Sequence, residues 1–284
     1  MTVMAVGGAL VMVMADIWVR AVRLRVLCGG PLTTREAVVV NQLGEAASAV
    51  TPARIGGEPV RFAELKRLRH PTGSILAVLI TERVVGWALI AVVLVVAAAL
   101  GGGELVAIVG RRVASLRSPL WMMVGLVLLL AIGSSWWWAI RYRRKVTSVT
   151  RMAERSPNLR APPFSRLVGA TGLTALSMAL RTAVLPVIAW PMVAGSLGFA
   201  TLGSFVLLYS QTLLPTPSGA GIVEAGFIAG MGPLGDAATV ASVLLAWRVL
   251  TVGVGAAIGA LILAQRGARW STLLLVPTLD GEAR

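Results

Sequence analysis

The sequence predicts an all-α fold, a polytopic bundle of about six membrane-spanning helices with two re-entrant hairpins broken by proline and glycine. Hydrophobic residues make up 57% of the 284-residue chain, charged residues only 13%, and the mean hydropathy is +0.83. Soluble domains carry roughly 25% charged residues. The apolar residues gather in long runs, and two stretches between these runs are rich in proline and glycine. We therefore expect residues 1–284 to form a single multi-pass membrane domain.

Six apolar runs are each near the ~20 residues that a helix needs to cross the hydrocarbon core of a bilayer. They are residues 2–19, 73–100, 119–140, 167–190, 192–214 and 237–264. The first run lacks the basic segment and the small-residue cleavage site of a signal peptide, so we interpret it as a span. Near its end, Asp16 is expected to pair with Arg20, four residues further on. In the last run, Gly255 and Gly259 have the spacing of close helix packing.

The net charge of +14 lies mainly in two segments between the apolar runs. Residues 141–166 contain eight Lys or Arg and one acidic residue, and residues 20–72 contain nine Lys or Arg and four acidic residues. Basic segments of a membrane protein stay on the cytoplasmic side. We therefore expect both segments to be cytoplasmic loops of a protein in the cell membrane. No nucleic-acid-binding motif accompanies the charge, so we expect no nucleic-acid partner.

The first interrupted stretch covers about residues 33–70. Thr33 and Glu36 have the spacing of a capping box, which predicts a helix through about Val50. This helix is too polar and too short for a span, so we interpret it as one limb of a re-entrant hairpin with its tip at residues 51–59. An amphipathic helix at residues 59–68 would be the returning limb. The alternative is a surface helix lying on the cytoplasmic leaflet.

The second interrupted stretch, at about residues 213–235, repeats the order of the first. Thr51-Pro52, Gly56 and Glu58 in the first stretch correspond to Thr216-Pro217, Gly221 and Glu224 in the second. Proline lacks the N–H that a helix needs and glycine lowers helix propensity, so neither stretch continues as a helix. Broken backbone at membrane depth is tolerated only where protein buries it or where it lines a watery cavity. Both tips are therefore predicted to form a site.

Each stretch is followed about 25 residues later by an arginine in an apolar run, Arg83 and Arg248. Charged groups inside spans are costly and usually face the protein interior, so we expect Glu82 and Arg83 to face the first tip and Arg181 to point inward. Residues 101–118 are expected to be an external loop. Paired interrupted segments in the two halves of a membrane protein indicate a transport site. The candidate substrate-binding residues are Pro52, Arg54, Gly56, Gly57, Glu58, Arg61, Glu82, Arg83, Pro215, Pro217, Gly219, Gly221, Glu224 and Arg248.

The residues that usually carry catalysis or bind metals are scarce. Cys28 is the only cysteine and His70 the only histidine, and no paired aspartates have the spacing of metal ligands. The recognised catalytic and metal constellations are therefore missing from the sequence. We expect no enzymatic activity, no metal and no cofactor.

These motifs resemble the membrane region of lysylphosphatidylglycerol synthases, which also occurs alone in flippase-like proteins. The resemblance runs from about Asp16 onward and rests on residues 51–61, 82–83, 214–224 and 247–248. The family usually has Pro-Gly-Gly where this chain has Pro217-Ser218-Gly219. Only the short tail at residues 265–284 follows the last run, so the resemblance implies the translocating part and not the lipid-modifying enzyme.

The resemblance implies a lipid flippase that moves the head group of a phospholipid, an aminoacylated lipid or a polyprenyl-linked lipid between leaflets. Its partners would be membrane lipids and, as a candidate, a glycosyltransferase or a lipid-modifying enzyme. The alternative is a non-catalytic accessory subunit of a glycosyltransferase or of a cell-envelope lipid pathway.

Passage of a lipid phosphate needs positive potential inside the bilayer. Helix N-termini at the tips would expose N–H groups. Arg54, Arg83 and Arg248 would add charge, because a guanidinium donates two parallel hydrogen bonds to phosphate. Three roles remain open for Glu58 and Glu224, namely positioning these arginines, binding a cationic head group, or only neutralising buried charge.

The topology also leaves two alternatives. If all four runs between the two stretches cross the membrane, both tips open to the same side. If one run does not cross, the tips oppose each other as in an inverted repeat, and the basic residues near the C-terminus fall in the cytoplasm.

Overall fold

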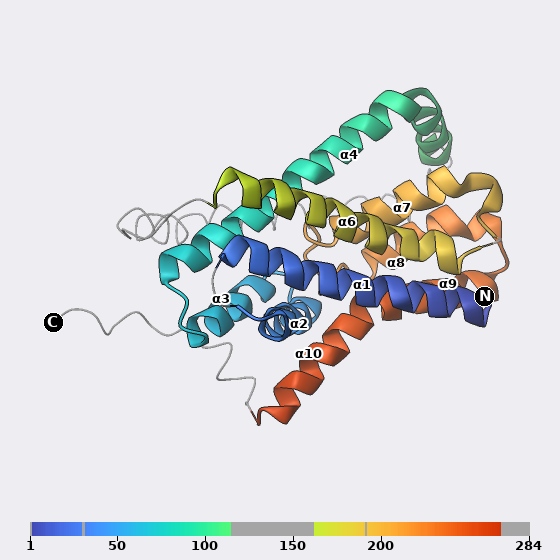
Figure 1. Ribbon diagram of the computed structural model, residues 1–284. Helices are drawn as coiled ribbons and strands as arrows, with labels where there is room; N and C mark the ends of the chain where they lie inside the picture. Colours follow the sequence, from blue (N-terminus) through green and yellow to red (C-terminus); the bar gives the residue numbers. More distant parts are fainter. Residues whose placement is uncertain (1, 30–31, 115–161, 191, 268–284) are drawn as a thin grey trace.

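The computed structural model is helical throughout the residues that it describes, which are 2–29, 32–114, 162–190 and 192–267 (Figure 1). The long helices are α1 (Val3–Cys28), α4 (Thr72–Ala114) and α6 (Phe164–Ile188). The shorter ones are α2 (Thr34–Val50), α3 (Gly57–Arg67), α7 (Leu197–Ser210), α8 (Ile222–Met231), α9 (Ala237–Arg248) and α10 (Val254–Gln265). A π-helical turn, Val249–Gly253, joins α9 to α10, and two 3₁₀ turns, Ala194–Ser196 and Gly232–Leu234, precede α7 and follow α8.

Four helical segments of the described residues are long and apolar enough to cross a membrane. They are Val3–Cys28, Thr72–Ala97, Phe164–Ile188 and Ala237–Gln265, and they agree with four of the six predicted runs. The chain is therefore a multi-pass helical membrane protein. The predicted run at 119–140 lies outside the described residues, as do nearly all of the basic segment 141–166 and of the tail 265–284.

Three predicted boundaries are wrong. The first span does not end at residue 19, because α1 continues to Cys28, so residues 20–28 of the expected loop 20–72 are helical. The external loop expected from residue 101 does not start there, because α4 continues as a helix through three consecutive glycines to Ala114. Each glycine costs about 1 kcal/mol relative to alanine and does not by itself end a helix. Residues 192–214 do not form one span either, because α7 has only 14 residues and ends at Ser210. Its last turn gives way to 3₁₀-type bonds before Pro215 and Pro217, which a helix could not accommodate.

The first interrupted stretch folds as a helix, a turn and a helix. The capping box is present, since the Thr33 hydroxyl accepts from the Glu36 N–H at 3.2 Å and Glu36 accepts from the Thr33 N–H at 2.8 Å. The predicted helix to Val50 is confirmed as α2, and the amphipathic helix is α3. Helices α7 and α8 flank the second stretch in the same way.

The helices form two copies of one four-part unit. The order α1, α2, α3, α4 recurs as α6, α7, α8 and α9 with α10. Pro217 lies 165 positions after Pro52, and Arg248 lies 165 positions after Arg83. The same offset relates the first residues of α3 and α8, Gly57 and Ile222. The short sequence repeat at the tips is therefore part of a larger repeat in the order of the described helices.

The two units are inverted relative to each other along their first helices. Helices α1 and α6 pack side by side and run in opposite directions (Figure 1). The Arg23 Nη1 group donates to the Thr174 hydroxyl at 3.3 Å, and the Ser177 hydroxyl donates to Asp16. Contacts thus move toward the start of α1 as they move toward the end of α6. Because α1 and α6 are equivalent elements, this antiparallel packing makes the repeat an inverted one.

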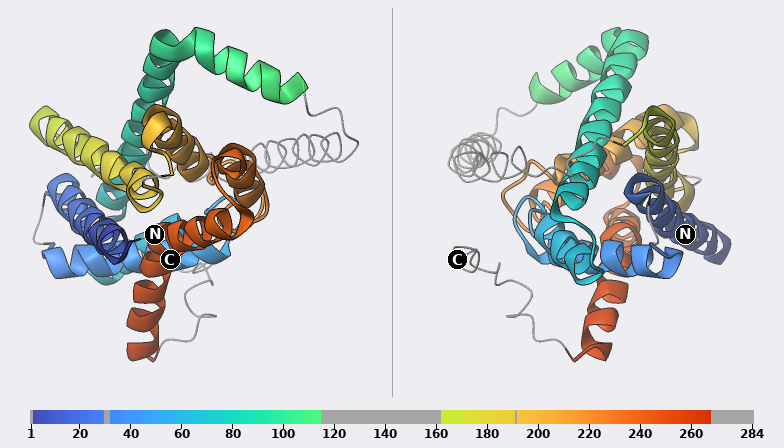
Figure 2. Two further views of the ribbon diagram at one scale, coloured as in Figure 1. Left: turned by 90° about the vertical axis from the view of Figure 1, so that its right-hand side faces the viewer. Right: turned by 60° about the vertical axis from the view of Figure 1, so that its left-hand side comes forward.

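Helix α10 crosses α2 at very short range (Figure 2). A Cβ atom placed on Gly259 would lie 2.1 Å from the Gln42 carbonyl oxygen, and one placed on Gly255 would lie 2.8 Å from Glu45 Cγ. The predicted role of these two glycines in close helix packing is confirmed. The crossing ties the last helix of the second unit to the first interrupted stretch.

The Gly259→Ala variant should be less stable than the original protein. The added methyl group meets a backbone oxygen that cannot rotate away, and overpacking of this kind costs about 1–3 kcal/mol. Thermal unfolding in detergent, followed by circular dichroism, should show a lower midpoint. The control is Gly172→Ala on α6, where an added Cβ meets no atom within 4 Å. An unchanged midpoint for Gly259→Ala would contradict the packing described here.

Candidate functional site

The two interrupted segments meet at their tips. We call residues 51–56 tip 1 and residues 211–221 tip 2. Pro52 and Pro217 form an antiparallel β-bridge, so equivalent residues of the two units face each other. The Ala53 N–H donates to the Leu214 carbonyl at 3.0 Å. On the other side of the bridge, the Ala49 carbonyl accepts from the Ser218 hydroxyl at 3.2 Å.

Both tips use left-handed backbone. Within the two tips, φ is positive at Ala53 (49°), Arg54 (56°), Ser218 (48°), Gly219 (70°) and Gly221 (86°). For residues other than glycine this conformation costs roughly 1–2 kcal/mol. Ser218 occupies a position where glycine would be free of that cost, and its side chain compensates. Its hydroxyl donates across the tips and also accepts from Arg54 Nη1 at 3.3 Å.

A glutamate in the first turn of the helix after each tip forms an ion pair with an arginine further along the chain. Arg83 Nη2 lies 2.7 Å from Glu58 Oε1 in the first unit, and Arg248 pairs with Glu224 in the second. Arg248 Nη1 also donates to the Ser218 carbonyl at 3.0 Å, and Glu224 accepts from the Gly221 N–H at 2.6 Å. The spacing of about 25 residues seen in the sequence thus corresponds to a contact.

Arg54 links the two tips and reaches into the interior. Besides Ser218, its Nη1 group donates to Gln211 at 3.4 Å, and its Nη2 group pairs with Glu45. Glu45 comes from α2 and is buried. One carboxylate therefore holds the arginine that spans the tips.

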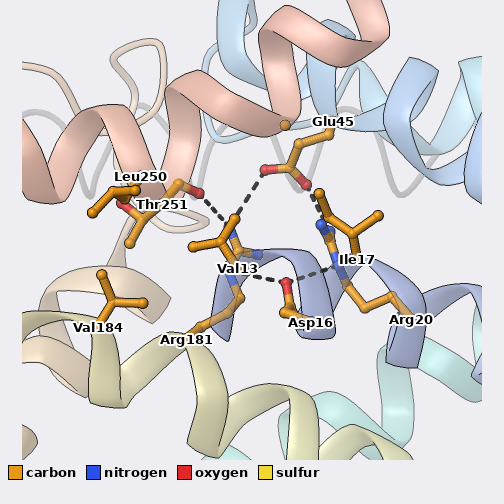
Figure 3. A pocket seen from close by; sticks show the side chains of 10 residues that line it. Val13, Asp16, Ile17, Arg20, Glu45, Arg181, Val184, Leu250 and Thr251 are labelled. Carbon is orange, nitrogen blue, oxygen red and sulfur yellow. Dashed lines mark hydrogen bonds and ion pairs between the residues drawn. The ribbon is translucent and has the colours of Figure 1, made fainter. Parts of the chain in front are cut away.

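Glu45 belongs to a cluster of charges between α1, α2 and α6 (Figure 3). Arg20 lies 2.9 Å from Glu45 and 3.1 Å from Asp16, and the predicted pairing of Asp16 with Arg20 is confirmed. Arg181 lies 3.5 Å from Glu45 and donates to the Thr251 carbonyl at 2.6 Å. Glu45 and Arg20 were missing from the predicted site. The only sequence feature that could have identified them is a charged residue on an apolar segment. Many surface residues share this feature, so it does not distinguish site residues.

A second cluster surrounds Glu82. Arg61 pairs with one carboxylate oxygen, and Arg23 lies 2.9 Å from the other. Glu82 is buried and faces inward. Arg83 lies at a half-exposed position beside Glu58. The expectation that this charged pair points inward to the first tip is therefore met only in part. Glu82 points inward but pairs with Arg61 and Arg23, while Arg83 contacts Glu58 of the expected tip but is half-exposed. Arg23 is a further residue that sequence reasoning missed.

A polar cavity of about 150 Å³ opens next to tip 1. Its lining comes from α1, α2, tip 1, α3 and α4, with Thr212 from tip 2. The residues are Arg20, Arg23, Asn41, Gly44, Glu45, Ser48, Arg54, Gly57, Glu58, Arg61, Arg83 and Thr212. Five arginines face two glutamates, so the chemistry suits an anion. Within the described residues, no three His, Cys, Asp or Glu side chains come together as a metal site.

The structure divides the predicted site residues into two groups. Arg54, Gly57, Glu58, Arg61 and Arg83 line the cavity. The others do not line it: Pro52, Gly56, Pro215, Pro217, Gly219 and Gly221 shape the two tips, Glu224 and Arg248 form the ion pair of tip 2, and Glu82 holds Arg61 from behind.

Cysteines at Pro52 and Pro217 should form a disulfide. Residues facing each other in an antiparallel bridge have Cα atoms about 4.5–5.5 Å apart, which is within the range of a disulfide. The double variant, made with Cys28→Ser, should oxidise within the chain, and mass spectrometry should find the cross-linked peptides. A matched Pro52→Cys, Leu197→Cys pair should not cross-link. Two free thiols in the oxidised double variant would contradict the contact between the tips.

Replacing Ser218 should separate backbone strain from hydrogen bonding. Ser218→Ala loses both hydroxyl bonds and keeps the unfavourable φ, so we expect a loss of about 1–3 kcal/mol. Ser218→Gly loses the same bonds but regains conformational freedom, so its loss should be smaller. Thermal unfolding of both variants in one detergent measures the difference. Equal midpoints, or a more stable alanine variant, would exclude this account.

The comparisons with known proteins agree with this architecture. The model of one family, described as lysylphosphatidylglycerol synthase TM region, matches residues 1–259. No curated protein and no solved structure matches the chain. The family match covers the first unit, both tips, the cavity and the second unit as far as the middle of α10. The chain therefore belongs to the lysylphosphatidylglycerol synthase transmembrane-region family.

Proposed function

We propose that this protein moves the phosphate-bearing head group of a membrane lipid across the bilayer. The observation that carries the proposal is that two broken segments, from inverted halves of the chain, meet beside an arginine-rich cavity. The family is named for an enzyme whose product is a membrane phospholipid, which supports a lipid as the substrate.

The lengths of the interrupted helices support re-entrant hairpins. At 1.5 Å per residue, the 14 residues of α7 span about 21 Å and the 10 residues of α8 about 15 Å, less than the ~30 Å hydrocarbon core. We propose that α2 with α3 and α7 with α8 each enter the membrane and return to the side from which they came. Because the units are inverted, the two hairpins enter from opposite sides. Sites of inverted-repeat transporters lie where such segments meet, near the middle of the bilayer.

The charge balance of the two clusters favours an anion. Around Asp16, Glu45 and Glu224 lie four arginines, and around Glu58 and Glu82 lie three. These arginines are Arg20, Arg54, Arg181 and Arg248 in the first group and Arg23, Arg61 and Arg83 in the second. Each group has one positive charge in excess. A phosphodiester carries one negative charge and would balance either group.

In this proposal the arginines replace the water molecules that hydrate the lipid head group. A charged head group loses its hydration when it enters hydrocarbon, which is costly unless charged partners and hydrogen bonds replace the water. Guanidinium groups already held by carboxylates are oriented before the lipid arrives, so little order has to be created on binding. The glutamates then position the arginines and keep the empty site from carrying a large excess of charge. We propose transport without chemical catalysis.

Lipid transport by the purified chain tests the function. Vesicles that contain the protein and a phosphatidylglycerol labelled on its acyl chain should lose label from the inner leaflet faster than empty vesicles, as shown by quenching with dithionite. Arg248→Gln should slow the exchange about tenfold or more, because a charged hydrogen bond contributes about 1.5–3 kcal/mol. Glu224→Gln should slow it less, since Arg248 keeps its charge and its bond to the Ser218 carbonyl.

The matched control is Arg67→Gln on α3, an arginine that is 59% exposed and lies outside the cavity. It should exchange lipid at the original rate. If vesicles that contain folded protein exchange lipid no faster than empty vesicles, the proposal is ruled out. A normal rate in Arg248→Gln would remove tip 2 from the transport path.

A further inference from the structure

The cavity beside tip 1 contains a buried arginine that the second unit lacks. Helices α3 and α8 begin 165 positions apart, so Gly226 of α8 stands at the position of Arg61 in α3. Arg61 is 9% exposed and lines the cavity. The repeated backbone at this position therefore does not itself require an arginine.

Two polar groups at the cavity have no partner among the described residues. The Asn41 side chain is 6% exposed, and its Nδ2 group makes no hydrogen bond within the part of the chain that the structure describes. The same is true of Arg61 Nε, although the other end of that guanidinium pairs with Glu82. Both residues line the cavity. Leaving buried donors unpaired is unfavourable, and a ligand with acceptor oxygens would satisfy them.

The charges around the cavity also exceed what the protein balances. Five lining arginines stand against Glu45 and Glu58. Two carboxylates outside the lining pair with three of these arginines, Asp16 with Arg20 and Glu82 with Arg23 and Arg61. One positive charge remains even when all four carboxylates are counted, and Arg181 shares two of these carboxylates. A cation would be repelled from this space. An anion would gain from both the charge and the free donors.

We propose that this cavity is a binding site for one phosphate group, with Asn41 and Arg61 as direct donors and Arg20 and Arg23 as sources of positive charge. The proposal deepens the transport function, on which it rests only in taking the phosphate to belong to a lipid head group. The two most exposed charged residues of the lining, Glu58 and Arg83, mark the open side of the cavity. Because Gly226 stands in the second unit where Arg61 stands in the first, we expect one such site within the described part of the chain.

The volume is adequate for this ligand. The cavity of about 150 Å³ is far larger than the roughly 10–15 Å³ that a single water requires. Gly44 and Gly57 keep the space between α2 and α3 narrow, since a Cβ on Gly44 would lie 2.6 Å from Arg61 Cγ and one on Gly57 would lie 2.1 Å from Ser48 Oγ. These close contacts hold the stem of Arg61 against α2, on the helix that carries Asn41.

Calorimetric titration of the purified full chain in a neutral detergent tests the site. The ligands are dioctanoyl phosphatidylglycerol, inorganic phosphate, and dioctanoylglycerol, which has no phosphate. We expect one phosphatidylglycerol per chain, competition by inorganic phosphate, and no binding of dioctanoylglycerol. Binding of inorganic phosphate without the lipid would support the site and identify the free ion as the ligand. Equal binding of dioctanoylglycerol would overturn it.

Asn41→Val supplies the critical variant, because valine is a branched side chain without a hydrogen-bond donor. It should weaken phosphatidylglycerol binding about tenfold or more while leaving the thermal midpoint unchanged or higher, since it removes an unpaired buried donor. A residue with a purely structural role would lower the midpoint. Arg67→Gln, outside the cavity, should bind normally.

Asn41→Asp keeps the shape and adds a negative charge, so it should abolish binding even if the valine variant does not fold. Unchanged affinity in either folded variant would reject the site. Loss of transport with intact phosphate binding would overturn the transport function and leave the site standing. Normal transport by a chain that binds no phosphate would overturn the site and leave the transport function standing.

Discussion

The fold depends on one constraint, that backbone N–H and carbonyl groups cannot be left without partners away from water. A membrane helix satisfies them internally, but prolines at 52, 215 and 217 prevent this at the two tips. The tips instead use each other, through the bridge between Pro52 and Pro217 and the bond from Ala53 to Leu214. Each break in one unit is thus stabilised by the corresponding break in the other, and neither tip could be buried in this form alone.

The buried charges are subject to the same requirement, since they too need partners away from water. An isolated charge inside the protein would be very costly, whereas a charge with several close partners can be retained. Glu45 contacts three arginines and Glu82 contacts two. Since these contacts join helices α1, α2, α3, α4, α6 and tip 1, the polar network holds the units together where hydrophobic packing alone would not specify one arrangement. It also leaves guanidinium groups oriented in a space that lipid tails do not favour.

The repeat has kept its scaffold and changed its interior. Equivalent helices have the same order, and the ion pair of Glu58 with Arg83 recurs as Glu224 with Arg248. The first unit, however, places the buried Arg61 on α3 where the second places Gly226 on α8. A symmetric frame with an asymmetric interior separates the two tasks, since the frame needs similar backbone in both halves and a binding site needs specific side chains in only one.

The sequence by itself determined the class, most of the spans and the places where helices break, because hydropathy, proline and capping are local properties. It predicted the capping box at Thr33, the close packing at Gly259 and the Asp16–Arg20 pair from residues a few positions apart. It misplaced the ends of α4 and α7, since the glycines at 101–103 weaken a helix without ending it and the turn before Pro215 begins several residues early. Only the tertiary structure decided that the units are inverted, that the tips meet, and that Arg20, Arg23, Asn41 and Glu45 share a site with Arg54. Those contacts join residues up to 169 positions apart, and their strength depends on burial and on neighbouring charges that exist only after the chain has folded.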